Sequence, residues 1–268
     1  MKILFFTYTI LFLCSCTEVP PILPTDNNST GSKEKNVLIE EYTGVRCQNC
    51  PSGAQQLEAL KQIHGDRLTI LSIHGGFFAQ PTNRENKYNL DNADGVALIN
   101  LFNQPVGYPS AMVDRKIFDG QSSIFSGANN WAGYIISEKS KEAAVSMDLL
   151  INKNTTTRQV SGQCIVKGLT DLGNQSYYLS VALAENNIKD AQLTLTGVDT
   201  NYIHRHVMRK FITGINGKKL DSITLNSNQS YSFTITIDPL WNLEQIYLVA
   251  FVHKNAPDYE VIQVVEKN

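Results

Sequence analysis

Residues 40–51 read EEYTGVRCQNCP and carry two cysteines, Cys47 and Cys50, separated by two residues. The apolar run at residues 37–39 comes directly before this stretch and predicts a buried strand. A helical pattern follows it, with a stop signal at Gly65 and apolar residues on one face, namely Leu57, Leu60 and Ile63. The cysteines are therefore expected where a strand ends and a helix begins.

This position favours chemistry at the two sulfurs. A helix N-terminus carries unpaired amides and a partial positive charge, and both stabilise a thiolate. Arg46 adds a positive charge beside Cys47. Two intervening residues let one turn bring the sulfurs within bonding distance, so we expect Cys47 and Cys50 to pair. A short CxxC at a helix start is more often redox-active or metal-binding than structural.

The order strand, CxxC, helix resembles the active site of the thioredoxin superfamily. A second motif carries the same resemblance, because Gly107-Tyr108-Pro109-Ser110 precedes an apolar strand where that family has a cis-proline. The resemblance implies that Pro109 is this proline and presents the backbone of Tyr108 to an extended substrate. Arg46 stands where the family has tryptophan, and Gln48-Asn49 replaces Gly-Pro. These departures leave the substrate class and the reduction potential open.

Two neighbouring carboxylates lie just before the cysteines. Glu41 precedes Cys47 by six residues and matches the buried acid that moves protons near the second cysteine in thioredoxin. The alternative is that Glu41 or its neighbour Glu40 points to solvent at the end of the strand. Successive residues of a strand lie on opposite faces, so the sequence alone leaves both alternatives open.

The N-terminal segment predicts export and a lipid anchor. Lys2 and the apolar residues 3–13 form a signal-peptide pattern that is too short to span a bilayer as a helix. The segment Leu13-Cys14-Ser15-Cys16 resembles the lipobox of bacterial lipoproteins, which implies that Cys16 is lipidated and that residues 1–16 are the signal and its anchor. An ordinary cleaved signal peptide is the alternative. Residues 17–35 lack apolar content and predict a flexible tether.

The rest of the chain predicts two folded domains. A length of 268 residues favours two domains, and a net charge of −2 gives no reason to expect a nucleic-acid partner. Residues 36–144 predict an α/β domain, thioredoxin-like by resemblance, with a helix at 91–103, a hairpin at 116–120 and a helix at 126–144. Residues 145–268 alternate apolar and polar side chains between turn residues. They predict an all-β immunoglobulin-like sandwich without long helices.

Three further side chains are candidates for chemistry. Cys164 shares a predicted strand face with Val160 and Val166, which favours a buried small hydrophobe over a resolving cysteine. His204 and His206 fall on one face if their segment is extended, and this spacing can bind a metal. Local packing of the two histidines is the alternative, since two ligands without a third are a weak signal.

The lipobox, the CxxC domain, a His-X-His-Val-X-Arg segment and the β-rich tail together resemble the outer-membrane-protein-28-related lipoproteins of Bacteroidetes-type bacteria. The resemblance implies an exported, lipid-anchored protein at the outer membrane of a Gram-negative bacterium.

Three functions are compatible with these features. The first is a thiol–disulfide oxidoreductase that acts on protein thiols or disulfides and needs no cofactor. In it, Cys47 attacks, Cys50 resolves and Pro109 forms the substrate platform. The second is a non-catalytic surface lipoprotein, whose β-sandwich binds a protein or glycan on a thioredoxin-like scaffold. The third is a metal site that combines the cysteines with histidines.

Overall fold

The computed structural model describes residues 33–82 and 85–268. The described residues form one compact unit. The predicted signal peptide, Cys16 and nearly all of the predicted tether lie outside the described residues. Among the described helices, none is long and apolar enough to cross a membrane.

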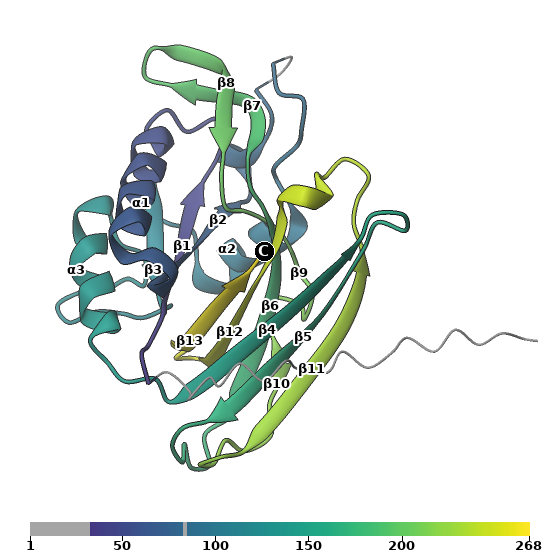
Figure 1. Cartoon of the computed structure of the whole chain (residues 1–268). Helices are drawn as coiled ribbons and strands as arrows, with labels where there is room; N and C mark the ends of the chain where they lie inside the picture. Colours follow the sequence, from purple (N-terminus) through teal and green to yellow (C-terminus); the bar gives the residue numbers. More distant parts are fainter. Residues whose placement is uncertain (1–32, 83–84) are drawn as a thin grey trace, which may run out of the picture. The chain divides into compact units, whose positions relative to one another are not determined.

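A single mixed sheet runs through both predicted domains. Its strand order is β13-β12-β6-β9-β2-β1-β3, and β10 pairs with β6 at its side (Figure 1). The strands are β1 (Val37–Thr43), β2 (Leu68–His74), β3 (Ser110–Val113), β6 (Tyr177–Glu185), β9 (Val207–Phe211), β10 (Lys218–Lys219), β12 (Ile246–Lys254) and β13 (Val261–Lys267). Within this sheet, the two halves of the chain are joined by a short parallel pairing of β2 with β9, at Ser72 and Val207.

The first half of the chain packs helices on both faces of β1. This strand lies between β2, which is parallel to it, and β3, which is antiparallel, and all seven of its residues are buried. Alternate side chains enter different cores. Val37 and Ile39 pack with α1 (Cys50–His64) and α3 (Ala128–Lys139). Leu38 and Tyr42 pack instead with α2 (Ala93–Phe102).

The predicted helices are present with shorter bounds. Asn92 caps α2 by accepting a hydrogen bond from the Gly95 amide at 2.8 Å. Gly65, with φ +57°, ends α1, as its position in the sequence predicts. Trp131 and Ile135 of α3 are fully buried. Ile63, which we expected on the inner face of α1, is 73% exposed. At 3.6 residues per turn it lies about 120° around the helix from Leu57.

The second half is β-rich, as the sequence predicts, and its described residues hold no helix longer than the three-residue turn Leu243–Gln245. A three-stranded sheet of β11 (Asn228–Thr236), β5 (Gln159–Gly168) and β4 (Val145–Asn154) shares a core with β6 and β12. This core includes Leu149, Leu183 and Leu248. The predicted boundary at 144/145 falls between α3 and β4, and the division into two domains stays a prediction.

The hairpin predicted at residues 116–120 is absent from the described structure, where residues 116–118 have no regular structure and residues 119–120 form a turn. The chain leaves β3 through Asp114 and Arg115, whose φ angles are +48° and +50°. The Asp114 carboxylate accepts a hydrogen bond from the Leu38 amide at 2.8 Å and pairs with the buried Lys35 ammonium. These side-chain bonds turn the chain away before a return strand can form. It comes back beside β3 only at Ser126, as a single bridge to Ala111.

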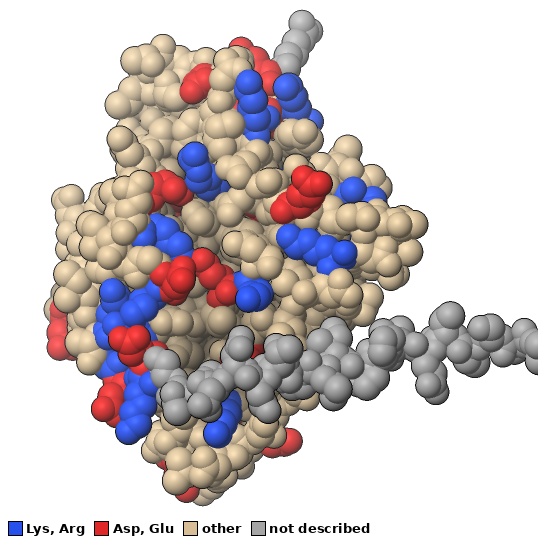
Figure 2. Space-filling model, in the orientation of Figure 1, with Lys and Arg blue, Asp and Glu red and all other residues tan. Residues whose placement is uncertain are grey.

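Acidic and basic side chains are interspersed on the face drawn in Figure 2, and neither sign forms a large uniform patch there. This distribution agrees with the small net charge of −2.

Candidate functional site: the Cys47–Cys50 turn

Cys47 and Cys50 form a disulfide, as predicted. Cys47 lies in the turn after β1, where its amide donates to the Gly44 carbonyl at 3.0 Å. Cys50 is the first residue of α1. Their Cα atoms are 5.4 Å apart. Both residues are buried, with exposed fractions of 3% and 2%.

Pro109 lies directly against the first turn of α1. The peptide bond between Tyr108 and Pro109 is cis, as the motif predicts. A Cβ atom at Gly53 would come within 2.7 Å of the Pro109 ring and 3.0 Å of Glu41 Oε1. The helix start, Pro109 and Glu41 are therefore in close contact, and this contact requires glycine at position 53.

Glu40 and Glu41 are both buried, so the solvent-facing alternative is wrong for each of them. Their side chains have different partners. Glu40 accepts two hydrogen bonds from the Arg115 guanidinium, both at 2.7 Å. Glu41 is close to Ser72 Oγ, which donates to Oε2 at 3.4 Å. No described residue donates a hydrogen bond to Glu41 Oε1.

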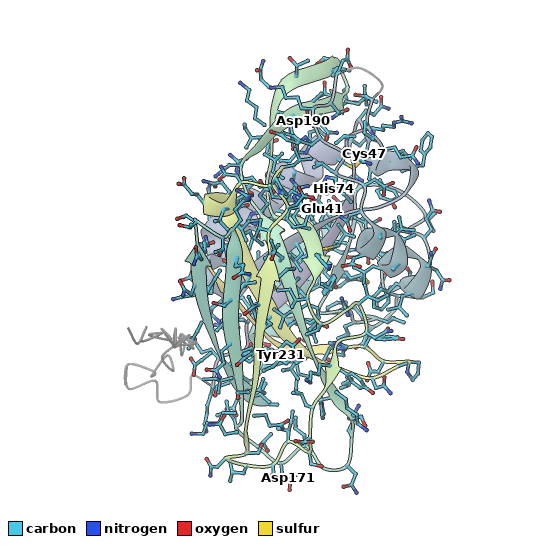
Figure 3. All side chains as sticks on the ribbon, turned by 90° about the vertical axis from the view of Figure 1, so that its right-hand side faces the viewer. Glu41, Cys47, His74, Asp171, Asp190 and Tyr231 are labelled. Carbon is cyan, nitrogen blue, oxygen red and sulfur yellow. A yellow bond between two sulfur atoms is a disulfide. The ribbon has the colours of Figure 1, made fainter. Side chains whose placement is uncertain are left out.

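Burial raises the pKa of Glu41 from its ordinary value of 4.5 to about 8, against the lowering effect of the hydrogen bond from Ser72. With this pKa, both the protonated and the ionised form of the carboxyl are populated near neutral pH. A group that accepts a proton from a thiol and later releases it requires this property. Figure 3 shows Glu41, Cys47 and His74 at the same end of the molecule.

We expect Glu41→Gln to stabilise the protein by roughly 1–3 kcal/mol above pH 8, because it removes a buried carboxylate that has no cationic partner and one oxygen without a donor. Below about pH 4.5 the acid is protonated in both the folded and the unfolded state, so the gain disappears. It grows as the pH rises from 4.5 to 8, since the unfolded chain ionises while the folded chain resists. Urea unfolding of both proteins from pH 4 to 9 measures this difference. A gain that is independent of pH would contradict the raised pKa.

The side chain of Arg46 contacts a neighbouring loop. Its Nε donates to the Pro81 carbonyl at 3.1 Å, and its guanidinium lies 5.5 Å from the centre of the Phe77 ring. The Arg46 amide donates to the Phe78 carbonyl at 2.9 Å. A Cβ at Gly44 would lie 2.2 Å from that same carbonyl, so glycine is needed for this close approach. The effect of Arg46 on the thiolate of Cys47 stays a prediction.

Sequence analysis missed the hairpin that packs on the cysteine turn. Strands β7 (Ile188–Thr194) and β8 (Gly197–His204) pair only with one another among the described strands. The Leu193 amide donates to the Val45 carbonyl at 2.8 Å. The Gln192 side-chain amide donates to the carbonyls of Cys47 at 3.0 Å and Gly44 at 3.2 Å. The only signal for this hairpin is the turn-forming Thr196-Gly197 pair, which does not indicate where the hairpin packs.

The shared face of His204 and His206 required an extended segment, and the structure does not meet this condition. Strand β8 ends at His204, and His206 has a φ of +56°, so the segment is not extended. His204 is buried with its ring centre 6.0 Å from that of His74. His206 instead contacts Glu58 Oε1 through Nε2 at 3.1 Å and the Tyr247 hydroxyl through Nδ1 at 3.0 Å. No group of three metal-binding side chains occurs in the part of the chain that is described.

Cys164 is fully buried in the core between the two sheets, and burial raises the pKa of its thiol to about 12. Its partners there are apolar side chains of β4 and β5, such as Leu149 and Val166. This environment fits the buried hydrophobe predicted from the sequence, because a thiol that stays protonated is a poor nucleophile.

The sequence comparison matches residues 95–268 to the family described as outer membrane protein Omp28. The chain belongs to the Omp28 family. The family's description agrees with the outer-membrane location that the resemblance implied. The search of curated proteins returned no match.

Solved structures show how the fold of this Omp28 member compares. HBP35 of Porphyromonas gingivalis is similar, with a TM-score of 0.70 and 21% identity over 88% of this chain and 76% of that one. A structural-genomics target from Agrobacterium tumefaciens has a TM-score of 0.51 and 10% identity over 88% of this chain and 94% of that one. At these identities the likeness concerns the fold alone.

Proposed function

We propose that this protein is a membrane-anchored thiol–disulfide oxidoreductase of the bacterial envelope, which exchanges disulfides with other proteins through Cys47 and Cys50. One observation carries the proposal. A CxxC disulfide spans the start of α1, and both Pro109 and Glu41 contact the first turn of that helix. A structural crosslink needs neither a buried acid nor a proline at this position.

The proposal includes the finer architecture. Residues 36–144 form a thioredoxin-like domain, and residues 145–268 form an immunoglobulin-like sandwich. A lipid on Cys16 holds the protein at the membrane, and residues 17–35 act as a tether. The order of β1, the cysteine turn, α1 and β2 supports the first assignment. The shared core of the three-stranded sheet with β6 and β12 supports the second.

The exchange proceeds in two steps. The thiolate of Cys47 attacks one sulfur of a substrate disulfide, forms a mixed disulfide and releases the other substrate sulfur as a thiolate. Glu41, in its ionised form, then takes the proton from the Cys50 thiol. The Cys50 thiolate attacks Cys47, which restores the Cys47–Cys50 disulfide and releases the second substrate sulfur. The substrate gains two electrons, and the reverse sequence oxidises a substrate dithiol.

A non-catalytic scaffold is the second candidate, and one observation favours it. Cys47 and Cys50 are almost completely buried, and β7 donates hydrogen bonds to the carbonyls of Val45 and Cys47. An incoming protein can reach Cys47 only after a neighbouring segment moves. If the protein is a non-catalytic scaffold, this movement does not occur and the disulfide is a permanent crosslink.

The reduction potential of the pair distinguishes the two candidates. We expect a value within about −120 to −270 mV, the range of thiol–disulfide oxidoreductases. The measurement equilibrates the protein in glutathione or dithiothreitol redox buffers and counts alkylated Cys47 and Cys50 by mass spectrometry. Buried Cys164 serves as the internal control, since its alkylation should not vary with the buffer. A potential below about −300 mV is typical of structural disulfides and would support the scaffold.

A further inference from the structure

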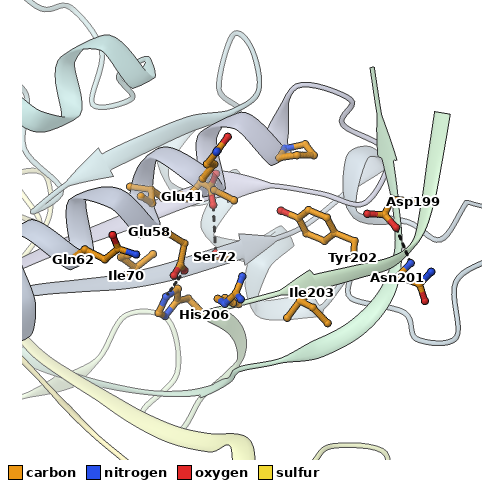
Figure 4. A pocket seen from close by; sticks show the side chains of 15 residues that line it. Glu41, Glu58, Gln62, Ile70, Ser72, Asp199, Asn201, Tyr202, Ile203 and His206 are labelled. Atoms are coloured by element: carbon orange, nitrogen blue, oxygen red, sulfur yellow. Dashed lines mark hydrogen bonds and ion pairs between the residues drawn. The ribbon is translucent and has the colours of Figure 1, made fainter. Parts of the chain in front are cut away.

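Three charged side chains form a buried cluster close to the point where the described chain begins. Lys35 lies just before β1, Asp114 just after β3 and Glu138 in the last turn of α3. The side chain of Lys35 is 5% exposed, and both carboxylates are 0% exposed. Other ion pairs face water, such as His206 and Glu58 in the pocket beside α1, whose side chains are 13% and 35% exposed (Figure 4).

We propose that Lys35 and Asp114 form an isopeptide crosslink, an amide bond between Lys35 Nζ and Asp114 Cγ, and that Glu138 moves the protons for this reaction. The bond forms within the folded protein and releases one water molecule. The proposal is independent of redox activity, because the cysteines take no part in the reaction.

The orientation of Asp114 gives each of its oxygens a different role. Oδ1 accepts a hydrogen bond from the Leu38 amide at 2.8 Å, and Oδ2 contacts Lys35 Nζ. The Leu38 amide therefore stabilises the negative charge that develops on Oδ1 when the amine attacks Cγ, and Oδ2 is the leaving oxygen. Lys35 Nζ also donates to Glu138 Oε2 at 3.0 Å, so a proton acceptor lies next to the attacking nitrogen.

The reaction balances without a further reactant. The Lys35 ammonium first gives a proton to Asp114 Oδ2, which leaves a neutral amine and a carboxylic acid. The nitrogen then attacks Cγ and forms the C–N bond. Glu138 takes a proton from this nitrogen and gives it to Oδ2, the Cγ–Oδ2 bond breaks, and the oxygen leaves as water. One ammonium and one carboxylate thus become one neutral amide.

The two carboxylates are suited to different tasks. Burial raises the pKa of Asp114 to about 6, which favours its protonated and more electrophilic form. Burial acts on Glu138 in the same direction, but the charge of Lys35 and the hydrogen bond from Lys141 lower the pKa of Glu138 to about 2. Burial lowers the pKa of Lys35, but the charges of Asp114 and Glu138 outweigh it and raise this pKa, so the reaction starts from the ion pair.

The amide also removes two buried charges. Taking an ammonium and a carboxylate out of water is costly even when the two are paired. After the reaction Glu138 still has the ammonium groups of Lys116 and Lys141, which contact its Oε1 at 3.0 and 2.7 Å. The amide oxygen keeps the Leu38 donor, and the amide N–H faces Glu138 Oε2. The neutral product therefore leaves no charge uncompensated.

The crosslink lies where a membrane anchor would pull on the folded body. Lys35 ends the proposed tether, and Asp114 follows β3, which pairs with β1. A bond between them carries the load from the N-terminal segment to both strands through a covalent link.

The test is peptide mapping of the full protein, isolated from its native compartment, then unfolded, reduced and digested with trypsin. Trypsin does not cleave after an acylated lysine. The bond therefore predicts residues 34–46 joined to residues 88–115, with a mass one water below the sum of the two peptides. Complete cleavage after Lys35, with residues 88–115 at their unmodified mass, would overturn the proposal. A link from Lys35 to residues 117–139 would place the bond at Glu138 and would also overturn it.

Variants test the roles of the individual residues. Lys35→Arg keeps the cation but cannot form this amide, so we expect no linked peptide. Glu138→Gln should slow linkage by at least roughly 100-fold, the lower range for general acid–base catalysis, measured as the linked fraction against time after synthesis. Lys141→Arg changes an exposed lysine that contacts the same glutamate and should leave linkage complete. A linked peptide in Lys35→Arg, or an unchanged rate in Glu138→Gln, would contradict the assignment.

Discussion

Replacing Glu40 by Gln is expected to lower the free energy of unfolding by about 3–5 kcal/mol at pH 7, which is the typical cost of breaking a buried ion pair by removing one partner. Both side chains of the Glu40–Arg115 pair are fully buried. The Arg115 guanidinium also lies between two aromatic rings, 5.1 Å from the centre of Phe102 and 4.8 Å from that of Phe251. Glutamine preserves the shape of Glu40 but leaves this cation without its counter-charge.

The neighbouring residue supplies the matched control. Glu41→Gln makes the same chemical change one position along the same strand, and we expect it to stabilise the protein at pH 8 and above. The exposed Asp119→Asn should have no measurable effect. Urea unfolding of the three variants at pH 7 and pH 9 gives the comparison. A loss below about 1 kcal/mol for Glu40→Gln would mean that the pair contributes no more than a surface ion pair.

Local patterns in the sequence were sufficient to predict the strand and the helix on either side of the cysteine turn. The buried strand before Cys47, the helix after Cys50 and the stop at Gly65 follow from apolar spacing and from the conformational freedom of glycine. The cis bond before Pro109 followed from a family motif. The β-rich character of the second half followed from its alternation of apolar and polar residues.

Contacts between distant residues were not predictable in this way. Glu40 and Arg115 are 75 residues apart, and Gln192 is 145 residues from Cys47. Periodicity states which face of a strand is buried, but it does not identify the partner across the core. For that reason the sequence left open whether Glu40 or Glu41 points to solvent. The structure buries both side chains, each against a different neighbour.

The histidines show a related limit. Alternation places His204 and His206 on one face only if the backbone stays extended. His206 adopts a left-handed conformation, and its amide is held by the side chain of Asn186 at 2.8 Å. No residue-spacing rule indicates such a break when a non-glycine residue occupies the position.

Changing Cys50 to Ala should trap partner proteins covalently, while changing Cys47 to Ala should trap none. Cys47 precedes the helix, whereas Cys50 is the first residue of α1, whose first turn lies against Pro109 and Glu41 at Gly53. In the proposed mechanism the partner is bonded to Cys47, and only Cys50 releases it. Removing Cys50 therefore preserves the attacking sulfur and stops the reaction at the mixed disulfide.

Two further variants complete this design. Cys164→Ala removes a buried thiol that the mechanism does not use, so it should leave trapping unchanged when combined with Cys50→Ala. Glu41→Gln with both cysteines intact should slow resolution and raise the fraction of mixed disulfide, because Cys50 then loses its proton acceptor. An unchanged fraction would assign the proton transfer to water rather than to Glu41.

The most direct measurement is a non-reducing gel of the Cys50→Ala and Cys47→Ala proteins. Both are expressed in the protein's native compartment, and their thiols are alkylated before lysis. Oxidoreductase activity predicts discrete bands of higher mass for Cys50→Ala that disappear on reduction and are absent for Cys47→Ala. Equal trapping by the two variants, or trapping by neither, would contradict the assignment of Cys47 as the attacking sulfur and favour the scaffold.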